Sequence, residues 1–504
     1  MRRYFRSTYC ETALSVTAWL DKFCISKAVY AALRKLRFVR LLLPEPKVIR
    51  LERSRLEELG PQNSLHTVDV VGSVHSFVST DVSFKMREVL QFFYRTGQLP
   101  KQSKQLSIKI SGDGFLMRRK GWTFLHFTVV DVRLPHSADA NWVISMAKCA
   151  EKSEVLRAMC KHAETTLLQI RTSGIQLGAT NEIFRVEFYI SADQKFLAVI
   201  LGLKGPTNIC FCPWCVIIKD KSQNGVSIGA LRNNMDSLRN VCSASQECLP
   251  MLTFVEMDGI IPDILHLAMR CVEKLVLVLF VDAQKTSSDM MNPNSAQFRY
   301  VQQLRLILHM DEFKFYVSKN PQNWKKPNLT EQQCQTILDN LNNLIVYRDN
   351  KDKDARRLKK KTLDLHHKIC TTLNQNKSFS EPEIDSLAVD IAEWTRSWVG
   401  RFTASWINSC HVVSQHIIYY LRRFGNIYKF SQQGIEATVK TVKQNVSGSI
   451  LGSADVSWQY MRRKGRQTAR LQDRAKNHQV KECQRCQKEG HSRKSSKSCS
   501  FYHQ

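Results

Sequence analysis

The fold of this chain is decided by the stretch LSIKI at Leu106–Ile110 and the SGDG at Ser111–Gly114 that follows it. Apolar and polar residues alternate in the first segment, and this period of two predicts a β-strand. The second segment predicts the end of that strand. Asp113 is therefore expected where a strand opens into a ligand crevice.

The segments that follow extend this strand into an α/β pattern. A basic turn leads to a second predicted strand at 122–130 and a third at 131–134. Helical residues are expected around 141–172, followed by a strand at 183–190 and a helix at 195–202. Three strands, a helix, a fourth strand and a helix together predict an α/β fold.

The length of 504 residues exceeds what one hydrophobic core usually holds, so several domains are expected. The expected divisions are a helical basic N-terminal region at 1–100, a first part of the core at 101–215, a helical insertion at 216–410, a last part of the core at 411–452 and a basic extended tail at 453–504.

The charge of the chain is strongly positive and uneven. There are 74 Lys and Arg against 45 Asp and Glu, a net charge of +29, and residues 1–55 and 461–504 supply 19 of these charges. A strongly positive charge attracts polyanions. Nucleic acid is the first candidate for such a partner, and an anionic membrane surface is the second. A basic run at 351–361 has three interpretations: a solvated helix face, a localisation signal or a DNA contact.

The sequence predicts neither a membrane span nor an export signal. The most apolar run, Leu275–Val281, is far shorter than the ~20 residues of a spanning helix. Sixteen cysteines in such a chain favour reduced thiols or metal sites over disulfides.

Three acids are candidates for a catalytic metal site: Asp113, Asp193 and Glu436. Asp193 follows the strand predicted at 183–190, and Glu436 lies in a predicted helix. Three converging carboxylates would suit a pair of Mg²⁺ or Mn²⁺ ions, because hard cations choose oxygen ligands. Taken singly, a Gly-Asp-Gly is usually a turn and a helix acid is usually solvated, so the prediction depends on the set.

The helix around Glu436 has two distinguishable faces. Ile435, Val439 and Val442 form an apolar stripe at helical spacing, which predicts the buried side. Lys440 and Lys443 share the face of Glu436, where they could hold phosphates beside a metal site.

A second set of residues predicts a zinc site. Cys212 and Cys215 form a CxxC, and His411 and His416 are a second ligand pair. Two thiolates and two imidazoles make a tetrahedral structural zinc site. Histidines five residues apart lie about 140° apart on an ideal helix, so both can face one metal only near a bend or a helix end. The alternative is a redox CxxC with two unrelated histidines.

The order of these residues along the chain is Asp113, Asp193, Cys212, Cys215, His411, His416 and Glu436. In this order the chain resembles the DDE transposases, specifically the Transib branch and the related catalytic subunit of the V(D)J recombinase. It also resembles the recombinase-like proteins of invertebrate genomes. The resemblance covers roughly 100–450. A RING-type zinc region and a nonamer-binding motif are not evident in this chain. The resemblance therefore does not indicate which DNA sequence this protein would choose as its target.

The resemblance implies a fold, cofactors and partners. The fold would be an RNase H-like mixed sheet with a large, mainly helical, zinc-containing insertion. Asp113, Asp193 and Glu436 would hold Mg²⁺ or Mn²⁺, and the cysteines and histidines would hold Zn²⁺. The expected partner is double-stranded DNA, as element ends and target. The expected protein is nuclear and a homo-oligomer.

A rival to Asp193 as second acid lies in the segment MDGIIPDILH. It contains Asp258, Asp263 and His266. Many DDE families carry an Asp-x-x-His here that is distinct from the catalytic Asp. Asp263 and His266 are therefore interpreted as a structural or substrate-side pair.

The C-terminal tail holds a further metal candidate, made of Cys483, Cys486, His491 and Cys499, with His503 as an alternative fourth ligand. Its opening spacing is that of a zinc knuckle, a module that binds single-stranded nucleic acid. Seven residues, in place of the usual four, precede the last cysteine. The alternative is a disordered basic tail with incidental cysteines.

Three functions remain open from the sequence. The first is a transposase or transposase-derived recombinase that cleaves DNA and transfers strands. The second is a domesticated DNA-binding protein without catalysis. The third is a metal-dependent nuclease without strand transfer, which would share the same site.

Overall fold

The structure is a computed structural model of the 504-residue chain. It describes residues 13, 15–21, 27–35, 44, 46–70, 73–100, 103–117, 120–137, 140–150, 153–178, 182–203, 212–217, 230–232, 250–286, 292–317, 324–325, 328–344, 353–402, 407–449 and 456–477. The chain divides into two compact units: a first unit of Met1–Tyr189 with Gly434–Gln504, and a second unit of Ile190–Gln433.

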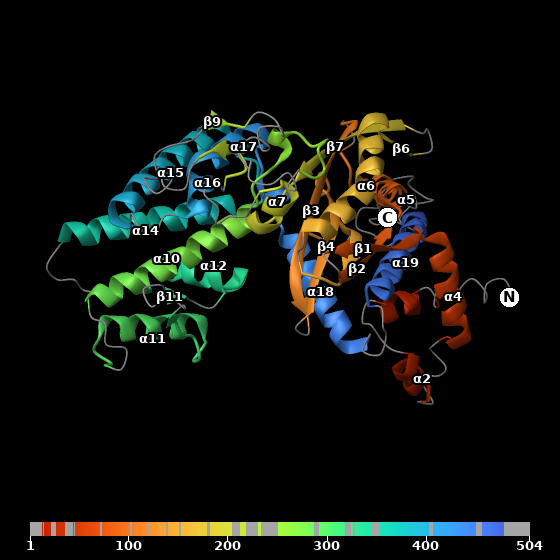
Figure 1. The fold of residues 1–504 in the computed structure, drawn as a ribbon, viewed down its shortest axis with the longest axis horizontal. Coiled ribbons are helices and arrows are strands. Elements are labelled where there is room, and N and C mark those ends of the chain that lie inside the picture. The colour runs from red at the N-terminus through yellow and green to blue at the C-terminus, as the bar shows by residue number, and fades with distance from the viewer. Residues whose placement is uncertain are drawn as a thin grey trace, which may run out of the picture. The chain divides into compact units, whose positions relative to one another are not determined.

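The first unit is built on a mixed seven-stranded sheet, which confirms an α/β fold (Figure 1). The strands are β1 (Asn63–Val70), β2 (Ser73–Thr80), β3 (Gln105–Met117), β4 (Lys120–Val129), β5 (Asn141–Ala147), β6 (Ile175–Leu177) and β7 (Glu182–Ile190). Their order across the sheet is β1-β2-β5-β4-β3-β7-β6, so β3 lies between β4 and β7.

Strand β3 runs through the SGDG segment, where the sequence predicted that it would end. Gly112, Asp113 and Gly114 pair with Leu125, Phe124 and Thr123 of β4 in an antiparallel ladder. The long partner strand offers backbone hydrogen bonds along its whole length, and these outweigh the local turn preference of the glycines. Asp113 is therefore a residue within the strand.

The third strand of the core also differs from the prediction. It is β5, within a segment expected to be helical, whereas residues 131–134 form no strand and 131–133 are bends. Every residue of β5 is buried. A strand covered on both faces needs no alternation of polar and apolar residues, and its sequence NWVISMA therefore lacks the signal that identified β3.

Two expectations for the chain's flanks are wrong. Residues 63–80 of the expected helical N-terminal region form the hairpin β1–β2, because their β-branched residues pair along eight positions. Part of the expected extended tail is helix α19 (Val456–Asn477). Its buried Tyr460, Met461, Ala469 and Leu471 pack on the sheet and on neighbouring helices, and this burial overrides the polar composition.

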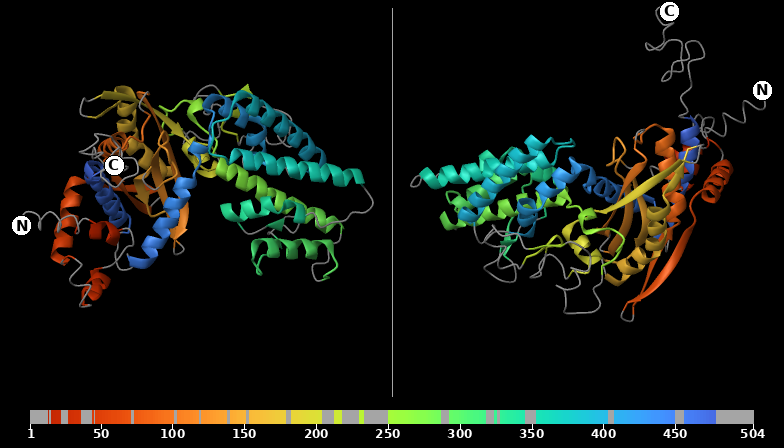
Figure 2. Two further views of the ribbon diagram at one scale, coloured as in Figure 1. Left: turned by 180° about the vertical axis from the view of Figure 1, so that it is seen from behind. Right: turned by 90° about the horizontal axis from the view of Figure 1, so that it is seen from above.

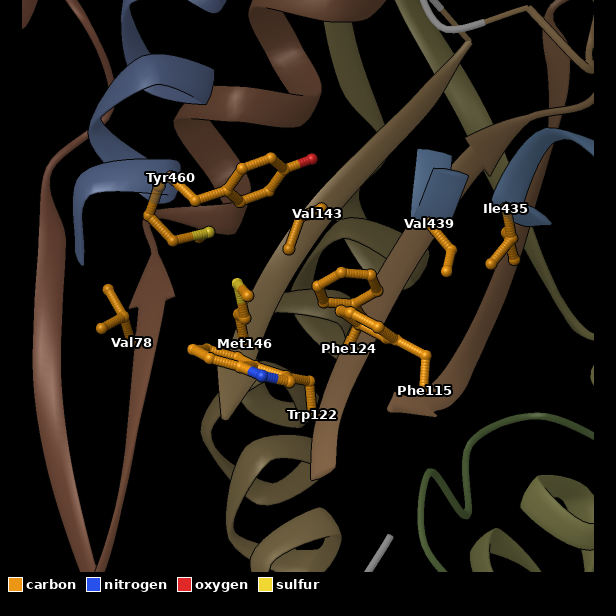
Figure 3. Packing of buried hydrophobic residues seen from close by; sticks show 10 residues of the cluster. Val78, Phe115, Trp122, Phe124, Val143, Met146, Ile435, Val439 and Tyr460 are labelled. Carbon is orange, nitrogen blue, oxygen red and sulfur yellow. The ribbon is translucent and has the colours of Figure 1, made fainter. Parts of the chain in front are cut away.

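The other helices of the first unit are α2 (Lys27–Lys35), α4 (Pro46–Leu59), α5 (Val82–Arg95), α6 (Ser153–Ser173) and α18 (Gln433–Ser449). Helix α18 carries Glu436 in its first turn. Its buried Ile435 and Val439 pack with Phe115 and Phe124 of the sheet, and α19 adds Tyr460 to the same cluster (Figure 3). The predicted buried side of this helix is confirmed at Ile435 and Val439; the Val442 side chain lies outside the described part.

The second unit is mainly helical, as expected for the insertion (Figures 1 and 2). Its helices are α7 (Gln194–Ile200), η1 (Met257–Gly259), α10 (Ile264–Thr286), α11 (Ala296–Leu308), α12 (Glu331–Asp339), α13 (Leu341–Leu344), α14 (Lys353–Leu373), α15 (Glu381–Phe402), α16 (Asn408–Gln415), α17 (Ile417–Phe424) and η3 (Tyr428–Phe430). Two short hairpins accompany them: β8 (Cys215–Val216) with β9 (Ala230–Leu231), and β10 (Tyr316–Val317) with β11 (Trp324–Lys325).

Helix α10 is the centre of the second unit. It packs against α11, α12 and α16, while α14 packs against α15. Among the helices in the described part of the chain, none combines the length and apolarity needed to cross a membrane.

Candidate metal centre

The structure brings together four residues that the sequence placed in one set: Cys212, Cys215, His411 and His416. We refer to them as the cysteine–histidine centre. All four are buried, and their ligand atoms lie within 4.8 Å of one another. The Cys212 Sγ is 3.3 Å from the His416 Nε2, and the Cys215 Sγ is 3.3 Å from the His411 Nε2. The two Nε2 atoms are also 3.3 Å apart, so four ligands surround one point.

The CxxC segment is held by hydrogen bonds of Trp214, the second of the two residues between its cysteines. The indole Nε1 of Trp214 donates to the Ile260 carbonyl at 2.7 Å, and the Trp214 carbonyl accepts from the Arg232 amide at 3.0 Å. The ring of Trp214 also lies 5.7 Å from that of His416, measured between ring centroids. No pattern in the sequence indicates that Trp214 or Ile260 would support this site.

A helix break allows both histidines to face the same point. Helix α16 ends at Gln415, His416 has the non-helical torsions φ −121° and ψ −28°, and α17 begins at Ile417. An unbroken helix would direct His411 and His416 about 140° apart. The break supplies the bend that the five-residue spacing requires.

The protonation states of Cys215 and His416 suit a metal, whereas Cys212 would lose its proton only on binding one. A hydrogen bond from Cys212, with further hydrogen bonds from His411 and His416, lowers the pKa of the Cys215 thiol. Burial raises the pKa of Cys212, and burial lowers the pKa of His416, which keeps its imidazole neutral. Thiolates and neutral imidazoles are the forms that bind soft and borderline cations. A buried Cys₂His₂ cluster of this kind can bind a metal such as zinc.

Burial also bears on the redox alternative for this CxxC. Neither cysteine has any exposed surface. Thiol–disulfide exchange needs a thiolate that a partner can reach, and reactive cysteines are therefore partly exposed. The geometry favours a ligand pair over a redox pair.

Two of the three candidate acids belong to the first unit. Asp113 is half-buried in β3 and shares a sheet face with Phe115, because side chains alternate along a strand. Helix α18 packs on that face, with the Lys443 Nζ 5.5 Å from the centre of the Phe115 ring. Glu436 is exposed one residue from the buried Ile435. The same helix thus presents both an acid and a cation beside this strand.

Asp193, the remaining acid, begins the second unit. It is the N-cap of α7, and its Oδ1 accepts a hydrogen bond from the Phe196 amide at 2.7 Å. It follows β7 in the chain, and β7 neighbours β3 in the sheet. The convergence of Asp193 with the other two acids stays a prediction.

The rival pair Asp263 and His266 has a well-defined environment in the second unit. Asp263 is buried, its Oδ2 is in close contact with the His266 Nδ1, and its Oδ1 accepts from the Gln432 amide at 3.0 Å. The carboxylate thus joins the start of α10 to the residue just before α18. Asp258 instead forms an ion pair with Arg423 near the surface.

Two other predicted features have different outcomes. The tail candidate of Cys483, Cys486, His491, Cys499 and His503 lies outside the described residues. In the basic run at 351–361, Lys359 pairs with Asp282 at 2.5 Å and Lys361 pairs with Glu393. These pairs favour a structural role for both lysines over direct DNA contact.

The chain matches no family model and no curated protein sequence. A functional conclusion consequently rests on the residues themselves. The cysteine–histidine centre has the most complete geometry among the predicted sites.

Proposed function

We propose that this protein is a DDE-type DNA transposase or recombinase that cleaves and transfers DNA strands in a reaction dependent on divalent cations. The observation that carries the proposal is the cysteine–histidine centre. Its cysteines follow Asp193 in the chain, and its histidines precede Glu436, in the order that the resemblance requires. A basic protein with such a site would act on DNA in the nucleus, as a homo-oligomer.

We assign zinc to the cysteine–histidine centre. The donor set of two sulfurs and two imidazole nitrogens fits a closed tetrahedral site, which leaves no open position for a substrate. Zinc would draw the proton from Cys212, whose thiol burial otherwise keeps protonated. The bound ion would then fix the CxxC segment to the α16–α17 junction, so its role would be structural.

The sheet supports an RNase H-like core. Strands β3, β4 and β5 lie side by side in chain order, and β7 returns beside β3 after helix α6. This arrangement puts the strand of Asp113 next to the strand that leads to Asp193. Helix α18, which carries Glu436, packs on one face of the same sheet.

The three acids have defined roles in this proposal. Asp113, Asp193 and Glu436 would hold Mg²⁺ or Mn²⁺, and the cations, when bound, supply the charge that activates a water or a 3′ hydroxyl and stabilises the leaving oxygen. Lys440 and Lys443 are exposed on the helix of Glu436. They would bind the phosphates on either side of the reacting bond and orient the strand.

Cleavage of DNA fragments taken from the two sides of the gene, where the ends of a mobile element would lie, tests the proposal. The wild type should nick and join these ends with Mg²⁺ or Mn²⁺, and Ca²⁺ should permit binding only. Glu436→Gln keeps the size of the side chain but removes the charge that binds a cation, so cleavage should fall by a factor of about 10³ or more while DNA affinity persists. Glu381→Gln, at an exposed acid in the first turn of α15, is the matched control and should cleave normally.

The outcomes separate the three functions. Equal cleavage by wild type and Glu436→Gln would exclude Glu436 as a metal ligand. Nicking without joining would identify a nuclease. Binding without cleavage by the wild type, with Mn²⁺ present, would identify a domesticated DNA-binding protein.

A further inference from the structure

The first unit contains a polar cavity that the proposed chemistry does not use. Its volume is about 570 Å³. One wall is helix α5, the opposite wall is the last turns of α6, and β6 with the start of β7 forms the floor. Figure 1 shows these elements grouped at one end of the sheet. We call this cavity the α5 groove.

Helix α5 presents a row of polar side chains to the groove. Ser83, Arg87, Gln91 and Arg95 recur every four residues and so lie along one side of the helix. The apolar side of α5 is buried in the core of the unit. The two arginines are exposed, and eight residues of helix put their Cα atoms about 12 Å apart along the axis. This row provides two separated positive charges with a neutral hydrogen-bonding group between them.

The floor of the groove is fixed by close backbone contacts. The amide of Gly178 donates to the Gln91 Oε1 at 3.1 Å, which ties the floor to the wall. Gly178 has φ +80°, and a Cβ there would lie 2.9 Å from the Tyr94 ring. Only glycine fits this conformation and this contact. The groove is therefore held in shape by its own packing.

The character of the lining restricts the ligand. Besides the arginines, three glutamines and two serines line the groove, Glu88 is its one acid, and three isoleucines form its apolar part. Pockets for apolar molecules are lined mainly by hydrophobic and aromatic side chains, and no aromatic residue is among these lining residues. A ligand that complements this groove is polar, anionic and extended.

We propose that the α5 groove binds a segment of single-stranded nucleic acid through its sugar–phosphate backbone. Arg87 and Arg95 contact phosphates, while the glutamines and serines contact sugars and further phosphate oxygens. The groove, with a volume of about 570 Å³, takes one strand in preference to a duplex. Since no ring is available for stacking, binding depends on charge and tolerates different sequences. The inference rests on the proposed function for its nucleic-acid partner but not on the three acids.

Photocrosslinking to the full-length protein tests the proposal. The probe is a single-stranded oligothymidine of sixteen residues that carries 5-bromouracil, beside a duplex of equal length. Crosslinked peptides mapped by mass spectrometry should include α5 or residues 169–178, with the single strand and not with the duplex. Crosslinked peptides that include neither α5 nor residues 169–178 would overturn the proposal. Equal crosslinking of these segments to the duplex would also overturn it.

A charge-matched pair of variants gives the quantitative test. Arg87→Glu with Arg95→Glu should weaken oligothymidine binding at least ten-fold and lower the slope of log K against log salt by about 1.4, since each single-strand phosphate contact contributes about 0.7. The control, Arg50→Glu with Arg185→Glu, changes the net charge equally at exposed sites outside the groove. Equal loss in both doubles would contradict the proposal.

Two comparisons keep this inference separate from the proposed catalysis. Groove crosslinks that persist in Glu436→Gln support the groove whatever the cleavage assay gives. Normal DNA cleavage without groove crosslinks would overturn the groove alone. Unchanged melting temperatures of both double variants would exclude unfolding as the cause of weaker binding.

Discussion

The cysteine–histidine centre is buried within the second unit, whereas Glu436 is exposed on α18 and Asp113 is half-buried in β3. Thiols and neutral imidazoles can be packed together in a protein interior at low cost, even before a cation binds. Carboxylates repel one another at the same distances, about 4 kcal/mol for a pair 4 Å apart in partly screened surroundings. A structural metal centre can therefore be assembled by packing, whereas an acidic site keeps its carboxylates hydrated on separate rigid elements until cations join them.

The largest effect should follow from removing a ligand of the buried centre. Cys215→Ser should abolish stoichiometric zinc and destabilise the second unit by several kcal/mol, because metal binding is coupled to folding. Cys334→Ser is the matched control, at a buried cysteine of the same unit outside the centre. It should retain zinc. Metal content by mass spectrometry and urea unfolding measure both effects, and a stable zinc-free Cys215→Ser protein would remove the structural role.

The next largest effect on stability is expected at a buried network of charged residues in the first unit. Asp21 accepts hydrogen bonds from Arg466 at 3.0 and 3.1 Å and from Arg470 at 2.6 Å. Burial opposes ionisation of Asp21, but the charges and hydrogen bonds of Arg466 and Arg470 outweigh it and lower the pKa of the carboxyl. The network joins α19 to the N-terminal helices.

Asp21→Asn should destabilise the first unit by about 3–5 kcal/mol, because it leaves the buried Arg470 without its acid and leaves Arg466 with Glu57 alone. Asp385→Asn removes an acid from an exposed pair with Arg422 and should cost less than about 1 kcal/mol. Denaturant unfolding of the two variants measures the difference. Equal small losses would show that the Asp21 network contributes little.

A smaller contrast separates Asp263 from Asp258, which are five residues apart. Asp263→Asn loses the charged partner of His266 and weakens the bond from the Gln432 amide, at a cost of about 1–3 kcal/mol. Asp258→Asn disturbs only a partly exposed pair and should be nearly neutral. Thermal unfolding compares them. A neutral Asp263→Asn would show that this carboxylate does not hold the chain before α18.

The smallest predicted effect concerns His126, in the middle of β4. Burial, and then the positive charges of Lys464, Lys109 and Lys85, lower the pKa of His126 to about 3. The unfolded chain binds a proton below about pH 6.5, so stability from the neutral ring is present above that pH and is lost as the pH falls towards 3. His126→Met should remove about 1 kcal/mol of the destabilisation between pH 6.5 and 5.5, the interval over which the unfolded histidine goes from half to almost fully protonated. An unchanged pH dependence of unfolding would contradict this.

The sequence predicted best where one pattern had one physical explanation. The alternation of LSIKI identified β3, and the stripe of Ile435 and Val439 identified the buried side of α18. The bend between His411 and His416 was required by helix geometry. Two cysteines and two histidines predict one site because their sulfur and nitrogen atoms together form a common set of zinc ligands.

Other elements depend on contacts that local sequence does not encode. The glycines of SGDG favour a turn, but β4 keeps them in a ladder. Strand β5 is buried on both faces, so its sequence does not alternate between polar and apolar residues. Helix α19 is polar in composition, and its docking through Arg466 and Arg470 depends on Asp21, about 450 residues earlier. No periodicity predicts a partner at that separation.

In the proposed active site, Asp113, Asp193 and Glu436 would bind the same divalent cations. Iron-directed cleavage of the zinc-loaded full-length protein tests it most directly, because Fe²⁺ in place of Mg²⁺, with ascorbate and peroxide, generates radicals that cut the backbone near the bound ion. We expect cuts near all three acids in the same sample, suppressed by excess Mg²⁺ and lost in Glu436→Gln. Cuts near only one acid, or cuts that Glu436→Gln leaves unchanged, would contradict it.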